Sequence, residues 1–110
     1  MPPRLKPGFF VRALIRRAEA AGAQGFVAKK GTEEAGAVLI KIARLNGTCT
    51  VLNQSADADG TRVWTRPLGE VCDEAKASAW FAKQMKFDPD LWIVEIEDRE
   101  GRTFVDEKVV

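Results

Sequence analysis

The sequence contains no histidine and only two cysteines, and these shortages limit the chemistry that the chain can carry. Zinc sites are built mainly from histidine and cysteine, and Cys49 and Cys72 lie in no Cys-x-x-Cys motif, so a zinc site is disfavoured. A serine or cysteine nucleophile would also have no imidazole base beside it. Cys72 lies near the start of an expected helix, a position that can activate a thiol. We nevertheless expect both cysteines to be inert, unpaired thiols.

Long apolar runs and a strong net charge are absent as well. No apolar run reaches 18 residues, and the first ten residues, MPPRLKPGFF, have no apolar signal core. We therefore expect a cytoplasmic protein with no membrane partner. A net charge of +1 gives no general attraction to nucleic acid or to a membrane surface. A chain of 110 residues fits a single domain over residues 1–110, and no cofactor is implied.

The charges are distributed unevenly along the chain. Residues 1–30 carry seven bases and one acid, whereas residues 67–110 carry eleven acids and six bases. One explanation is that the two ends of the chain lie against each other in the fold. The alternative is that the basic part forms a face for an anionic partner.

Hydrophobic periodicity and turn residues predict two helices and five or six strands. The expected helices are 8–21 and 73–86, and the expected strands are 24–30, 37–45, 48–55, 61–68 and 91–98, with a short sixth at 103–105. Residues 1–7, which include three prolines, are expected to form an extended basic lead-in. The first four strands, joined by short turns, predict an antiparallel meander. The predicted fold class is α+β, an antiparallel five- to six-stranded sheet with two helices packed on it, in the order α-β-β-β-β-α-β(-β).

The strand 37–45 is apolar on both faces and is interrupted by Lys41. A strand with one wet face alternates more cleanly between apolar and polar residues, so we expect a helix or another subunit to cover the second face. This strand is the basis for predicting a homodimer. The residues expected in the core are Trp64, Trp80, Trp92, Phe10, Leu14, Ile40, Phe81 and Val94.

The segment Phe87–Asp98, FDPDLWIVEIED, combines a proline turn, the clearest strand and five carboxylates. Alternation along the strand places Trp92, Val94 and Ile96 on one face, and Leu91, Ile93, Glu95 and Glu97 on the other. Glu95 and Glu97 would then lie roughly 7 Å apart on the same face.

These carboxylates allow three interpretations. Asp88, Asp90, Glu95 and Glu97 are the candidate ligands of a divalent cation. Glu95, Glu97 and Asp88 are the candidate groups for acid/base catalysis. The preferred alternative is ordinary cross-strand ion pairing with Lys29, Lys41, Arg62 or Arg66.

Basic residues form two candidate sites for nucleic acid or another anion. Arg12, Arg16 and Arg17 lie on the polar side of the first expected helix, and Lys29 and Lys30 begin the loop KKGTEEAG. Nucleic-acid modules usually combine bases with exposed aromatic residues, which are scarce here. The loop does not match the P-loop spacing, and its two glutamates would repel phosphate. We therefore prefer a solvated or acid-paired helix face and a plain hairpin turn.

Three segments, GFFVRALIRRAEAAG, KKGTEEAGAVLIKI and FDPDLWIVEIED, are distinctive when taken together. They resemble the small alphaproteobacterial domain-of-unknown-function family (fourteen-ninety-one), over nearly the whole chain. The resemblance implies a stand-alone cytosolic domain. It supplies no catalytic or binding residues.

The sequence thus favours a small non-enzymatic binding or interaction module that acts as a homodimer or with another protein partner. One alternative is a metal- or small-ligand-binding enzyme that uses the carboxylates of residues 88–98. The other alternative is a nucleic-acid-binding protein that uses the basic first helix.

Overall fold

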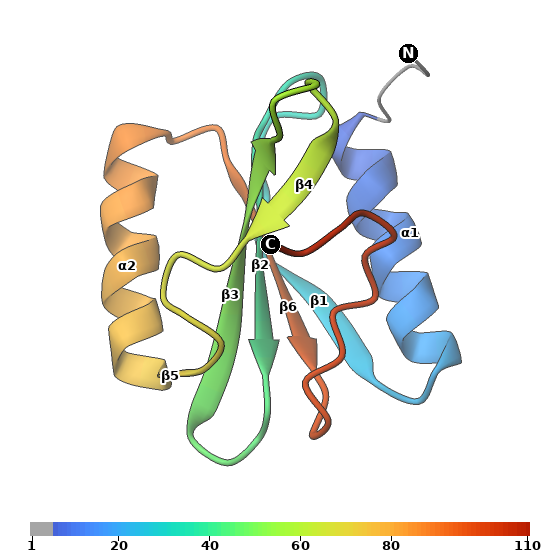
Figure 1. Cartoon of the computed structure of the whole chain (residues 1–110), viewed down its shortest axis with the longest axis vertical. Coiled ribbons are helices and arrows are strands. Elements are labelled where there is room, and N and C mark those ends of the chain that lie inside the picture. The colour runs from blue at the N-terminus through green and yellow to red at the C-terminus, as the bar shows by residue number, and fades with distance from the viewer. Residues whose placement is uncertain (1–5) are drawn as a thin grey trace.

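The computed structural model describes residues 6–110 and contains two helices and six strands (Figure 1). Their order is α1 (Pro7–Ala20), β1 (Gln24–Lys29), β2 (Val38–Ala43), β3 (Thr48–Ala56), β4 (Arg62–Thr65), β5 (Cys72–Asp73), α2 (Glu74–Phe87) and β6 (Trp92–Glu97). The predicted α+β class and the predicted order of elements are confirmed.

The sheet is mixed, with the strand order β1-β6-β2-β3-β4 and with β5 paired to β3. Strand β6 lies between β1 and β2, antiparallel to the first and parallel to the second. The prediction of a four-stranded antiparallel meander was therefore wrong at β1, and only β2, β3 and β4 follow one another as a meander. Strand β6 is buried on both faces at residues 92–94, and a central position in the sheet removes both of these apolar faces from water. Strand β1 is largely exposed and lies at the edge.

The two helices cover opposite faces of the sheet, so the molecule has three layers (Figure 1). The α1 side of the core contains Phe10, Val11, Leu14, Ala18, Ala23, Val38, Ile40, Ile42, Leu52, Trp64, Trp92, Val94 and Ile96. The α2 side contains Leu39, Cys49, Val51, Cys72, Ala77, Phe81, Leu91 and Ile93. Strand β2 is thus apolar on both faces because α1 and α2 of the same chain cover it. No second subunit is needed to cover this strand.

Helix α1 begins at Pro7, whose fixed φ suits the first helical position. The predicted extended lead-in 1–7 is therefore wrong at Pro7, and residues 1–5 lie outside the described residues. Helix α2 begins after Asp73, whose side chain accepts a hydrogen bond from the backbone N–H of Lys76 at 2.7 Å. This N-cap satisfies a donor that the helix itself leaves unpaired.

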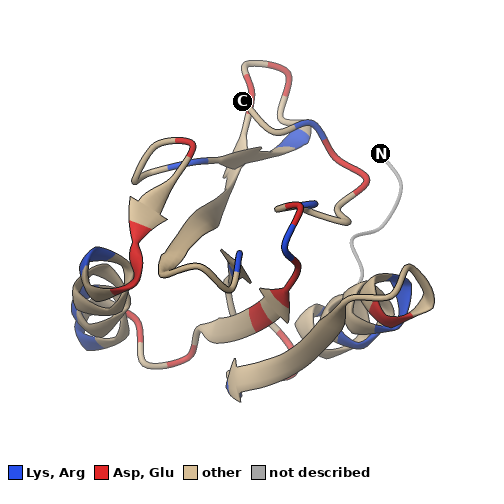
Figure 2. Cartoon of the chain, turned by 90° about the horizontal axis from the view of Figure 1, so that it is seen from below, with Lys and Arg blue, Asp and Glu red and all other residues tan. Residues whose placement is uncertain are grey.

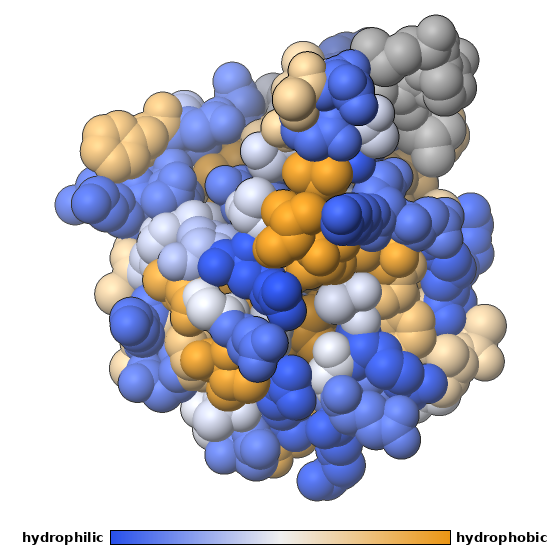
Figure 3. Space-filling view, in the orientation of Figure 1, coloured by the Kyte–Doolittle hydropathy of each residue, from blue (hydrophilic) through white to orange (hydrophobic). Residues whose placement is uncertain are grey.

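The predicted strand 103–105 is irregular, and Phe104 has a φ of 62°. The last residues instead run beside β4, where the Trp64 N–H donates to the Lys108 carbonyl and the Val110 N–H donates to the Trp64 carbonyl. This contact occupies the outer edge of β4. Hydrophobic residues gather in the middle of this side of the molecule, over β4 and the C-terminal end (Figure 3).

Seven of the eight predicted core residues are buried, and Trp80 is half-buried against the α2 side of the core. No helix within residues 6–110 has the length and apolar character needed to cross a membrane.

Candidate functional site

The four candidate metal ligands do not come together. Asp88 ends α2 and accepts a hydrogen bond from the Asp90 N–H at 3.1 Å, before β6 begins. Glu97 lies at the far end of β6, which advances by about 3.3 Å per residue and so separates the two ends by about 17 Å. Within residues 6–110, no three Cys, Asp or Glu side chains are arranged to hold a metal ion.

Glu95 forms the cross-strand ion pair that the sequence favoured. The parallel register places Lys41 opposite Glu95, and the Lys41 Nζ lies 3.5 Å from the Glu95 carboxylate. Lys41 also pairs with Glu74 at the start of α2. Burial on its own would lower the pKa of Lys41, but the hydrogen bond to Glu74 and the charges of Glu95 and Glu74 outweigh it, and the pKa is raised. Glu95 therefore neutralises a partly buried ammonium, which is a structural role.

Glu97 and Asp98 are neighbours in the sequence but differ in their interactions with basic residues. Among the described residues, Glu97 has no ion-pairing partner. Asp98 is buried and accepts hydrogen bonds from the backbone and the guanidinium of Arg102. The side-chain hydrogen bond from Arg102 lowers the pKa of Asp98, and burial opposes this effect. Asp98 thus holds the turn after β6.

The two thiols face each other beneath α2. Cys49 in β3 lies opposite Cys72 in β5 in the antiparallel strand pair, and their sulfur atoms lie 3.7 Å apart. Burial, together with the hydrogen bond and charge of Cys72, raises the pKa of Cys49 to about 12. Cys49 is therefore a poor nucleophile at neutral pH.

The basic candidates are largely engaged within the chain. Arg17 pairs with Asp106, and the Arg12 guanidinium lies 5.1 Å from the centre of the Phe9 ring. Lys29 Nζ donates to the carbonyl oxygens of Pro89 and Leu91 at 2.7 and 3.0 Å. Basic positions lie on both helices and acidic positions on β6 between them (Figure 2). The Arg17–Asp106 pair joins the basic N-terminal part of the chain to the acidic C-terminal part. This contact agrees with the prediction that the two ends lie against each other.

The remaining candidates are Arg16, which is exposed on α1, and Lys30, whose Nζ lies 3.9 Å from Glu33. The backbone of the loop after Lys30 packs closely against the proline turn. A side chain at Gly31 or Gly36 would collide with the Asp90 carbonyl, so this contact requires glycine. The glycines of this loop therefore allow two backbone segments to approach each other, and the loop does not resemble a phosphate-binding loop.

Two surface features were missed from the sequence. The first is the open edge of the sheet. Among residues 6–110, strand β1 pairs with β6 alone, and Phe26 and Val27 are 45% and 40% exposed. Helix α2 packs over β3 and β5, so it does not cover this edge. The sequence did contain a signal for this edge. Strand β6 is apolar on both faces, which is typical of a central strand, and a central β6 leaves β1 at the edge of the sheet.

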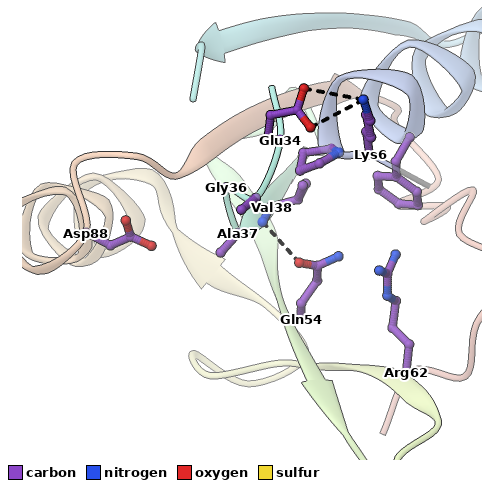
Figure 4. A pocket seen from close by; sticks show the side chains of 11 residues that line it. Lys6, Glu34, Gly36, Ala37, Val38, Gln54, Arg62 and Asp88 are labelled. Carbon is purple, nitrogen blue, oxygen red and sulfur yellow. Dashed lines mark hydrogen bonds and ion pairs between the residues drawn. The ribbon is translucent and has the colours of Figure 1, made fainter. Parts of the chain in front are cut away.

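The second feature is a cavity of about 420 Å³ between the start of α1, the loop before β2 and the β3–β4 hairpin (Figure 4). Its charged and polar lining comes from Lys6, Glu34, Gln54, Arg62 and Asp88. No local motif could have indicated it, because five separate segments contribute the lining.

Comparison with protein families gives a match to the family described as "Protein of unknown function (DUF1491)" over residues 5–106. A crystal structure of a DUF1491 family protein from Caulobacter crescentus CB15 is 42% identical, with a TM-score of 0.90, 97% of this chain covered and 100% of that chain. An NMR structure of a DUF1491 family protein from the same organism is 43% identical, with a TM-score of 0.84 and 96% of each chain covered.

The solution structure of protein Atu0922 from A. tumefaciens is 32% identical, with a TM-score of 0.81, 96% of this chain covered and 95% of that chain. A search of curated proteins gives no match. The family match spans nearly the whole chain and agrees with the resemblance carried by the three sequence segments. This chain therefore belongs to the DUF1491 family of proteins of unknown function.

Proposed function

We propose that the protein is a non-enzymatic interaction module that associates with a second copy of itself through β1. The observation that carries this proposal is the open edge of the sheet, where Phe26 and Val27 are exposed. An unpaired edge strand with apolar side chains is a template for strand addition. The edge at β4 is less suited to this role, because the C-terminal residues already lie along it.

The composition of β1 and its neighbour supports a second copy as the occupant. Two copies related by a twofold axis place their β1 strands antiparallel. With the axis at Phe26, the two Phe26 side chains meet, and Lys30 of each copy lies opposite Gly22 of the other, two residues before Gln24. Glu97 is the neighbour of Gln24 across the sheet. Its carboxylate has no ion pair among residues 6–110 and lies near the incoming lysine, so the two ends have complementary charge.

The shape of β1 limits the strength and extent of this association. The pairing of β1 with β6 shifts register between Val27 and Lys29, and such a bulge limits regular pairing between the two copies to the few residues around Phe26. An interface of this kind falls below about 1,200 Å², in the range of weak and transient contacts. We therefore expect a reversible dimer at high micromolar concentration.

Sedimentation velocity over a range of protein concentrations tests the proposal. The wild-type protein should show a dimer fraction that rises with concentration, and Phe26→Lys should remain monomeric because it places like charges at the axis. Phe9→Lys is the matched control, since Phe9 is 57% exposed on α1. A wild-type protein that stays monomeric at all concentrations would refute the proposal, as would a dimer that Phe26→Lys leaves intact.

A further inference from the structure

The cavity beside α1 has features that strand pairing does not use. Its volume of about 420 Å³ lies within the range typical of small-molecule sites. Lys6 and Arg62 contribute two positive charges to the lining, and Glu34 and Asp88 contribute two negative charges. Lys6 and Glu34 pair with each other at 3.3 Å. Arg62 and Asp88 line the same cavity.

The amide of Gln54 has a fixed orientation. Its Oε1 accepts the backbone N–H of Val38 at 3.1 Å, so the amide cannot be reversed without setting two donors against each other. The Nε2 group therefore points away from β2, toward the Arg62 side chain (Figure 4). Among residues 6–110, the Gln54 Nε2 has no acceptor.

The Arg62 guanidinium approaches the same region from β4. Gln54 and Arg62 lie on the same face of the sheet, since Gln54 is paired with Trp64 and Arg62 with Ala56. The guanidinium carbon lies 5.8 Å from the centre of the Phe10 ring. Its five N–H donors allow it to bind a ligand while it keeps other contacts. Two planar groups of donors therefore converge beside an apolar wall.

We propose that this cavity binds a small organic monocarboxylate. The carboxylate accepts hydrogen bonds from the Gln54 Nε2 and the Arg62 guanidinium, and the apolar part of the ligand contacts Phe10 and Val38. Two planar donor groups suit a carboxylate, which accepts bidentate hydrogen bonds. Asp88 in the lining disfavours a dianion such as phosphate.

NMR titration of the full chain with phenylacetate tests the proposal. We expect saturable shifts of the Val38 amide and the Gln54 side-chain amide. Phenylacetamide, which has the same apolar body without the charge, should bind about tenfold more weakly, because hydrogen bonds to a charged group are the stronger kind. Inorganic phosphate should also bind more weakly than phenylacetate.

Gln54→Glu gives the decisive comparison. It retains the acceptor for the Val38 N–H but replaces the donor with a negative charge, so phenylacetate affinity should fall about tenfold or more. Gln24→Glu makes the same change at an exposed position of β1 and should leave the affinity unchanged. Arg62→Gln provides a second test if Gln54→Glu does not fold. The proposal is overturned by the absence of saturable shifts, by equal binding of phenylacetamide, by tighter binding of phosphate, or by equal affinities of the two glutamate variants.

Discussion

The two faces of the sheet are built from different kinds of contact. The α1 face is a continuous cluster of thirteen buried hydrophobic residues, including Trp64 and Trp92. The α2 face has eight, among them both cysteines, and borders the ionic cluster of Lys41, Glu74 and Glu95. Burial of apolar surface is the main source of folding free energy, so the α1 face should dominate stability. The α2 face depends more on charge and protonation, and its properties should respond to pH.

The largest expected effect is truncation of Trp64 on the α1 face. Trp64 is fully buried, stacks on Phe10 at 5.7 Å, and donates from its Nε1 to Glu107. Trp64→Ala should lower the free energy of unfolding by about 4 to 5 kcal/mol, and Phe81→Ala on the α2 face by about 3 kcal/mol. Urea denaturation followed by circular dichroism measures both losses. Equal losses would contradict the difference between the faces.

The next effect is removal of the ammonium from the α2 face. The Lys41 and Glu95 side chains are 15% and 20% exposed, so Lys41→Met leaves two carboxylates partly desolvated. We expect a loss of about 1 to 3 kcal/mol, below the cost of breaking a fully buried pair. Adding Glu95→Gln should recover part of this loss, which a double-mutant cycle measures. A double variant with the summed loss of the single variants would show that the pair is not coupled.

A smaller effect is the response of the α2 face to alkaline pH. Because burial raises the pKa of Cys49 from 9.0 to about 12, the folded state favours the protonated thiol. This contribution is fully present below pH 9 and is lost as the pH rises toward 12. Lys41, whose pKa is raised from 10.5, adds a further loss only above that value. The change in the free energy of unfolding between pH 9 and 10.5 therefore reports the deprotonation of Cys49.

Cys49→Ala is the variant that isolates this thiol. Its free energy of unfolding should depend less steeply on pH between 9 and 10.5 than that of the wild-type protein. Chemical denaturation at a series of pH values gives the slopes. Parallel curves for the two proteins would rule out a contribution from Cys49.

The smallest expected effect concerns Glu97. Since Glu97 has no ion pair among the described residues, Glu97→Gln should change the free energy of unfolding by less than about 0.5 kcal/mol. Glu95→Gln, two residues earlier, should have a larger effect because it leaves Lys41 with one partner. Thermal denaturation of both variants side by side makes the comparison. A larger effect at Glu97 would mean that it has a structural partner.

Local patterns were sufficient to predict the faces of β6 and the buried side of α1. Alternation assigned Trp92 and Val94 to one face and Glu95 to the other, because side chains of a strand alternate whatever its neighbours are. Strand order depends on distant pairings, and short connections favoured a meander. The four apolar residues 91–94 were a signal for a strand buried on both faces, which is typical of parallel pairing.

The candidate sites were less predictable for a related reason. Lys41 was one of four possible partners for Glu95, and only the parallel register of β2 and β6 selects it. The cavity requires the Gln54 amide to be oriented by the first residue of β2, while Arg62 comes from the next hairpin. Neutral amides and single arginines carry no motif, so their convergence depends on tertiary structure.

The central position of β6 also has a consequence for the way the chain folds. Gln24 pairs with Glu97, so the strand that joins β1 to the rest of the sheet is synthesised after β1 to β5. Until it emerges from the ribosome, β2 has an unpaired edge and β1 has no strand partner. Pairings between distant segments slow folding because a long loop must close first. A nascent chain of this protein would therefore expose an apolar strand edge for most of its synthesis, which is the condition in which chaperones are needed.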